Sequence, residues 1–130
     1  GKNLLFTPGV YNVAGSIELT NADTVVLGIG LATLTAMEGA IPLKVSDVPG
    51  VIVAGMTIDA GPVESPVLFQ VGDRDGANDQ SDSSNPITLN DIYFRIGGPQ
   101  IGKTDIALEI NSNDVLVDHV WVWRADHGEE

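Results

Sequence analysis

The sequence of 130 residues is long enough for one domain with a sizeable core, and 43% of its residues are hydrophobic. Its 18 Asp and Glu residues against 6 Lys and Arg give a formal net charge of −12, which argues against nucleic acid and anionic membrane surfaces as partners. The lack of Cys excludes disulfides, thiol catalysis and thiolate metal sites, and no apolar run is long enough to span a bilayer.

The first predicted elements are two extended segments within residues 3–13, joined by a turn at Pro8 and Gly9. Alternation along these segments predicts that Leu5, Tyr11 and Val13 point inward. Residues 31–37 are the best helical candidate, but the segment is short and we predict a strand. The 15 Gly and 7 Pro residues also favour a turn-rich all-β chain.

From residue 17 onward, one unit recurs four times: a short apolar strand, a turn, and a second strand that carries Gly, Asp or His. The first strands end at Leu19, Val45, Val71 and Ile110, spaced by 26, 26 and 39 residues. A fixed period in this range indicates a solenoid whose strands stack rung on rung. The long interval contains the polar stretch 73–86, which we interpret as an insertion at a turn. The second strands are 25–28, 51–55, 87–91 and 115–119.

The later copies continue as strands beyond their Gly, Asp or His position, at 56–58, 92–94 and 120–123. Alternation divides these residues between two faces. We expect the core to receive Met56, Ile58, Ile92, Phe94, Val120 and Val122. The opposite, outward face then carries Thr57, Tyr93, Trp121 and Trp123.

Two segments resemble known proteins. Residues 5–13, Leu-Phe-Thr-Pro-Gly-Val-Tyr-Asn-Val, resemble an element near the start of pectate-lyase-like right-handed β-helices. Residues 118–127, Asp-His-Val-Trp-Val-Trp-Arg-Ala-Asp-His, are similar to the D-H-x-W-x-W-x-A-D-H segment of glycoside hydrolase family 55, mainly β-1,3-glucanases. With the repeat, the predicted fold is an all-β, right-handed parallel β-helix of about four rungs, formed by residues 1–130 as part of a longer β-helix domain.

The resemblance implies a secreted bacterial enzyme that removes glucose units from the end of a β-1,3-glucan by inversion. The proposed general acid of that family is a Glu downstream of the aspartate–histidine segment, and no matching motif holds Glu129 or Glu130. We therefore expect this chain to supply scaffold and sugar contacts, and to be inactive as an isolated piece. The alternative is a non-catalytic β-helix module that binds polysaccharide or serves as a structural scaffold.

The last strand carries the main substrate-binding candidates. Trp121 and Trp123 share a face, and exposed indole rings stack on the apolar faces of sugars. Arg124, Asp126 and His127 follow and could bind sugar hydroxyls. The alternatives are tryptophans packed beneath a neighbouring loop or domain, and a turn stabilised by an Asp side chain. The pair 118–119 occupies a repeated corner, so we predict a structural role for it.

Asp59 follows a strand at a position aligned with Arg95, which predicts an ion pair between neighbouring rungs. An inverting glycosidase needs two carboxylates about 6.5–9.5 Å apart. Asp59 and Asp126 are therefore weak catalytic candidates, and the catalytic residues are otherwise unknown.

The insertion contains Asp73, Asp75 and Asp79, which resemble a calcium loop in composition. Their spacing lacks the regularity and terminal Glu of a calcium-binding loop, so a solvated loop is the favoured interpretation. The sequence also lacks a nucleophile elbow, a phosphate loop and a His-rich pattern, and no cofactor is expected. The expected partners are a β-glucan and further chain that covers the ends of the solenoid.

Overall fold

The computed structural model describes residues 2–76 and 79–125, and none of these residues lies in a helix. The described residues form eleven strands, all paired in parallel. In chain order they are β1 (Leu4–Phe6), β2 (Val10–Val13), β3 (Ile17–Leu19), β4 (Val25–Gly28), β5 (Thr33–Ala36), β6 (Leu43–Val45), β7 (Ile52–Asp59), β8 (Ser65–Val71), β9 (Ile87–Ile96), β10 (Thr104–Ile110) and β11 (Val115–Arg124).

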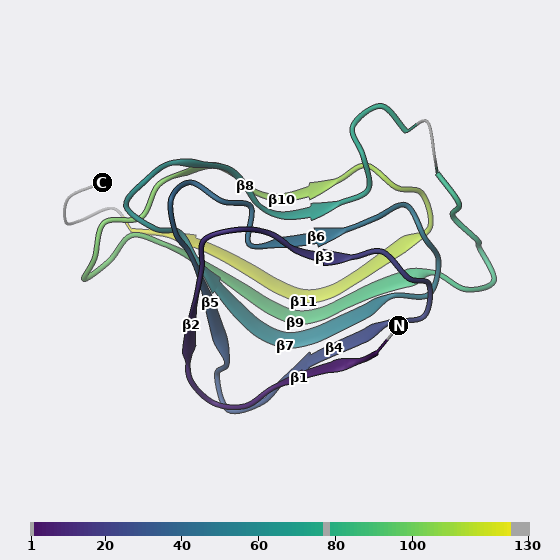
Figure 1. Cartoon of the computed structure of the whole chain (residues 1–130), viewed down its shortest axis with the longest axis horizontal. Helices are drawn as coiled ribbons and strands as arrows, with labels where there is room; N and C mark the ends of the chain where they lie inside the picture. Colours follow the sequence, from purple (N-terminus) through teal and green to yellow (C-terminus); the bar gives the residue numbers. More distant parts are fainter. Residues whose placement is uncertain (1, 77–78, 126–130) are drawn as a thin grey trace.

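The strands enclose the core on three sides, as Figure 1 shows. The long strands β7, β9 and β11 bend midway: their first halves stack on β4 and β1, and the second half of β7 pairs with β5, which pairs with β2. We call the sheet formed by β1, β4 and the first halves of the long strands face 1. We call the sheet formed by β2, β5 and the second halves of the long strands face 2. Face 3 is the separate sheet β10-β8-β6-β3. This is the predicted right-handed parallel β-helix, and the four strands of face 3 mark its four rungs.

The bend between face 1 and face 2 lies at the repeated corner. Gly55, Asp91 and His119 have φ angles of 74°, 54° and 52°, which is the left-handed region. A Cβ on Gly55 would collide with the carbonyl oxygen of Gly28 in the rung below, so this rung requires glycine. His119 thus lies at the corner that the repeat predicts, and its structural role stays a prediction. The side chain that follows each corner is thereby placed on the inward side.

The core lies between the three faces and follows the register of the rungs. Ile58 of β7 aligns with Phe94 of β9, and both are at most 1% exposed. Val122 of β11 continues this inward column, but it is 56% exposed because no further rung covers it in the described structure. The predicted inward positions of β7 and β9 are confirmed. The residues buried in the core include Val26, Leu34, Leu43, Val53, Met56, Phe69, Leu89 and Ile92.

One predicted orientation was wrong. Leu5 aligns with the exposed Leu27 and is itself 62% exposed, because its neighbours Leu4 and Phe6 occupy the inward positions of β1. Arg124, a candidate for binding sugar hydroxyls, aligns with the buried Ile96 on the inward side of face 2 and is exposed. Its Nη2 donates to the carbonyl oxygen of Thr104 at 3.2 Å.

Candidate functional site

The outward side of face 2 carries a continuous set of side chains from five successive strands. Because side chains alternate along each strand, one outward column runs from Asn12 through Thr35, Asp59 and Arg95 to Trp123. A second, parallel column lies one pleat away. It contains Val10, Thr33, Thr57, Tyr93 and Trp121. The rung-to-rung stacking therefore gathers residues that are far apart in the sequence onto one surface.

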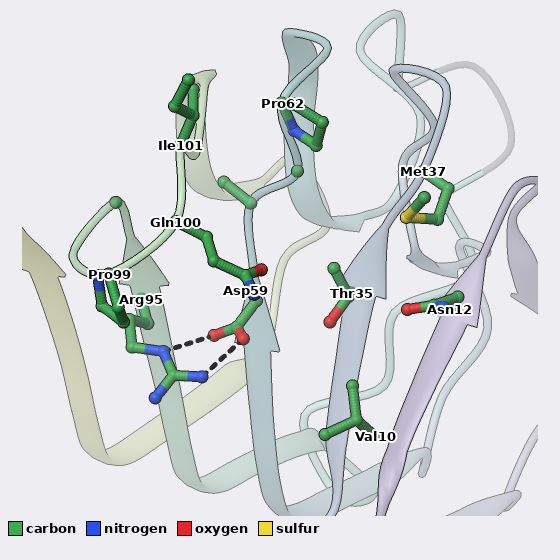
Figure 2. A pocket seen from close by; sticks show the side chains of 13 residues that line it. Val10, Asn12, Thr35, Met37, Asp59, Pro62, Arg95, Pro99, Gln100 and Ile101 are labelled. Atoms are coloured by element: carbon green, nitrogen blue, oxygen red, sulfur yellow. Dashed lines mark hydrogen bonds and ion pairs between the residues drawn. The ribbon is translucent and has the colours of Figure 1, made fainter. Parts of the chain in front are cut away.

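This surface is hollowed into a groove of about 550 Å³, within the size range of ligand sites. Its floor is formed by Asn12, Thr35, Asp59 and Arg95 on neighbouring strands. Loops at the carboxyl ends of the strands form a wall, and Figure 2 shows Gln100 extending from one of them over the groove. The other lining residues are Val10, Met37, Ala60, Gly61, Pro62, Gly97, Pro99 and Ile101.

Asp59 and Arg95 form the predicted ion pair across adjacent strands (Figure 2). Nε of Arg95 donates to Oδ1 of Asp59 at 2.9 Å, and Nη2 donates to Oδ2 at 2.6 Å. The hydrogen bond to Asp59 raises the pKa of Arg95, so the guanidinium stays charged. Half of the Arg95 side chain remains exposed toward the groove, whereas 16% of the Asp59 side chain does. The pair leaves further guanidinium N–H groups for a ligand.

The aromatic residues beside the groove point outward, as predicted from alternation. Trp121 is 67% exposed and pairs in register with Tyr93, which is 39% exposed. Trp123 is 40% exposed and lies next to Arg95 on the adjoining strand. The two tryptophans thus extend the groove surface with an apolar, aromatic area, although sugar binding by them stays a prediction.

Two further candidates, Asp126 and His127, lie outside the described residues. Their predicted contacts with sugar, and the weak catalytic pairing of Asp126 with Asp59, therefore stay predictions. Arg124 lies at the inward edge of the last rung, away from the outward columns that form the groove.

The aspartates of the segment 73–86 do not assemble into a metal centre in the described part of the chain. Asp79 accepts from the backbone N–H of Ser81 at 3.0 Å and from the side-chain amide of Asn113 at 2.7 Å. The hydrogen bonds from Ser81 contribute most to lowering the pKa of Asp79. The carboxylate therefore stabilises a turn, as in other Asp-rich loops.

The groove walls are the part of the site that the sequence did not predict. They come from residues 60–62 after β7 and residues 97–101 after β9. The repeat aligns the strands but does not predict how these connecting residues are placed. The adjacent Gly and Pro residues at 61–62 and 97–99 are the sequence signal for tight turns at these strand ends.

The comparisons with known proteins give a consistent result. Over residues 1–130 the chain matches the family described as the LAM55 pectate lyase-like domain. The chain belongs to this family. It is 52% identical over 129 residues to an exo-beta-1,3-glucanase of Streptomyces sp. (strain SirexAA-E / ActE). The aligned residues make up 99% of this chain and 21% of that protein, so the chain spans about a fifth of its relative's length.

Solved structures of sacteLam55A from Streptomyces sp. SirexAA-E share the same fold. One matches with a TM-score of 0.92 and 54% identity, and covers 98% of this chain and 23% of that one. A variant of sacteLam55A in complex with glucose matches with a TM-score of 0.91 and 52% identity over the same shares. The β-helix of this LAM55 domain therefore agrees with that of a solved relative over nearly all of its rungs.

Proposed function

We propose that this chain is part of a glycoside hydrolase that acts on β-1,3-glucan, and that its described residues supply scaffold and sugar contacts. One observation carries the proposal: the groove and two exposed tryptophans form one outward surface in a LAM55 domain. The identity to an exo-beta-1,3-glucanase supports the choice of glucan, and a glucose complex of a relative supports the choice of sugar.

The chemistry of the groove suits an uncharged sugar. Asn12, Thr35 and Gln100 bring neutral donors and acceptors, and the charges of Asp59 and Arg95 compensate each other. Sugar hydroxyls both donate and accept, so such a mixed set satisfies them without a net charge. The apolar faces of the rings then contact aromatic side chains at the end of the groove.

The carboxylates of the groove decide which catalytic roles we assign to this chain. Asp59 is the one carboxylate among the described residues that line the groove, and both of its oxygens accept from Arg95. An inverting hydrolysis uses two carboxyl groups about 6.5–9.5 Å apart, one as acid and one as base. We place the catalytic pair beyond the groove described here, and give Asp59 the role of orienting Arg95 toward the ligand.

The same observation favours the second candidate, a non-catalytic module that binds polysaccharide. In either case the last rung needs a cover, because Val117 and Val122 leave inward-facing apolar surface exposed. We propose that further chain of a longer protein stacks on this rung. We also propose a secreted protein, because a glucan polymer is encountered outside the cell.

The test combines binding and turnover on laminarin, a soluble β-1,3-glucan. We expect reducing-sugar release by the full-length protein that carries this chain, and about a tenfold weaker affinity in Trp123→Ala. Leu116→Ala is the matched control: Leu116 lies on the same strand, is 58% exposed and aligns with Thr88 on face 1. Binding without sugar release would support the module instead of the enzyme. Laminarin binding that is equal in both variants would contradict the assignment of the groove.

A further inference from the structure

The two ends of the loop between β9 and β10 lie close together at the end of β7. A Cβ on Gly102 would lie 2.6 Å from the backbone nitrogen of Gly97 and 3.1 Å from the carbonyl oxygen of Ala60. The next residue, Lys103, donates its backbone N–H to the carbonyl oxygen of Gly61 at 2.9 Å. The base of the loop is therefore closed and tied to the end of β7, while residues 98–101 project beside the groove.

Gly98 lies at the side of this loop that meets Trp123. The atoms nearest to a Cβ built on Gly98 are Cη2 and Cζ3 of the Trp123 indole, both at 3.4 Å. Gly98 has a φ of 115°, a conformation that residues other than glycine rarely adopt. The loop backbone thus passes directly along the six-membered ring of Trp123, in a conformation that glycine makes available.

We propose that Gly98 is a positioning residue of the carbohydrate site: it lets the 97–102 loop press against Trp123 and hold the indole in place for the sugar. The inference rests on the proposed function, because it concerns how Trp123 is held beside the sugar-binding groove. In the sheet register, Trp123 also neighbours Arg95, which Asp59 holds by two hydrogen bonds. The loop and the ion pair therefore both adjoin the ring of Trp123.

The contact between the loop and Trp123 strengthens binding, because an indole ring that is already held in place loses little conformational freedom when the sugar binds. The same loop contributes Pro99, Gln100 and Ile101 to the groove lining. A change at Gly98 therefore reaches the ligand through the ring of Trp123 and through the wall, without Gly98 itself needing a ligand contact.

The first experiment measures the mobility and environment of the Trp123 indole by fluorescence. The chain has two tryptophans, so Trp121→Phe leaves Trp123 as its single indole fluorophore. In this background we expect Gly98→Ala to lower the fluorescence anisotropy and shift the emission of Trp123 to longer wavelength. Gly76→Ala is the matched control, since Gly76 has a φ of 65° with open space around it. Pro99→Gly loosens the loop without adding an atom near the ring, and should act in the same direction even if Gly98→Ala fails to fold.

The second measurement is the affinity of the full chain for laminaritetraose. With Trp123 present, Gly98→Ala should weaken binding about twofold to tenfold, and in a Trp123→Ala background it should add little. Unchanged anisotropy and emission in both Gly98→Ala and Pro99→Gly would overturn the positioning role. Equal losses of affinity in both backgrounds would overturn it as well. A clear spectral change with no laminaritetraose binding by the parent chain would instead overturn the proposed function.

Discussion

The guanidinium of Arg74 forms a bidentate ion pair with Glu109 of the neighbouring rung: Nε donates to Oε1 at 2.7 Å and Nη2 donates to Oε2 at 2.8 Å. Gln70 and Asn111 donate to the same carboxylate, so three side chains donate four hydrogen bonds to it on the outward side of face 3. The hydrogen bond from Arg74 is the largest cause that lowers the pKa of Glu109 to about 2. This contact fastens the start of the polar segment 73–86 to β10.

The first prediction concerns the pH dependence of this contact. A carboxyl whose pKa is lower in the folded protein contributes stability that is present above its ordinary pKa of 4.5 and lost as the pH falls toward 2. Replacing Glu109 by Gln should therefore lower the free energy of unfolding by about 1 kcal/mol at pH 7, and change it little at pH 2. Urea denaturation at both pH values measures this. Glu18→Gln is the control, because Glu18 lies in the same outward column but is 3.6 Å from Lys44.

The second prediction concerns a buried carboxylate at the turns. Asp47 is 4% exposed, and its Oδ2 accepts from the backbone N–H of Asp73 at 3.0 Å while Oδ1 accepts from the Ser112 hydroxyl at 2.5 Å. Asp47→Ala leaves the buried Ser112 hydroxyl and the backbone N–H of Asp73 without their acceptor, so it should cost about 2–4 kcal/mol of stability. Thermal unfolding checks this. In Asp82→Ala, which removes bonds to the exposed Ser84 alone, the melting temperature should stay close to that of the parent; an equal drop in both variants would contradict the account.

The third prediction compares two residues of one inward column. Phe94 is 1% exposed and Val122, its partner in the next rung, is 56% exposed. Phe94→Ala should destabilise the chain by about 3–5 kcal/mol, whereas Val122→Ala should cost less than about 1 kcal/mol. Chemical denaturation of the 130-residue chain provides both values. A large cost at Val122 would show that this end of the chain is covered in solution.

The fourth prediction addresses the ion pair in the groove. Asp59→Asn removes the charge that holds Arg95, and Arg95→Gln removes the guanidinium itself. Each should weaken binding of laminaritetraose about threefold to tenfold, since a hydrogen bond to a charged group contributes roughly 1 kcal/mol or more. Isothermal titration calorimetry measures the affinities. Binding that survives both substitutions unchanged would place the sugar elsewhere.

Most of the fold could be predicted from the sequence because a solenoid repeats its contacts. The corner residues Gly55, Asp91 and His119 recur at the same place in each unit, and once they are aligned the register of Asp59 with Arg95 follows. Local ambiguity caused the failures. Leu4, Leu5 and Phe6 are all apolar, so alternation cannot decide which of them faces inward until β4 fixes the register.

The site could be predicted only in part, for a related reason. Its floor and its tryptophans belong to strands, whose alternation is visible in the sequence. Its wall belongs to the connections between face 2 and face 3, which differ in length and sequence from rung to rung. The contact between Gly98 and Trp123 joins such a loop to the next strand, and no periodic pattern relates the two.

A crystal structure of the chain with laminaritetraose would show directly whether the groove on face 2 binds the sugar. We expect sugar rings on the outward side of β5, β7 and β9, with hydroxyls next to Arg95 and one ring face against Trp123. Sugar bound on face 1 or face 3, or a groove left unoccupied while laminaritetraose binds elsewhere in the crystal, would contradict this expectation.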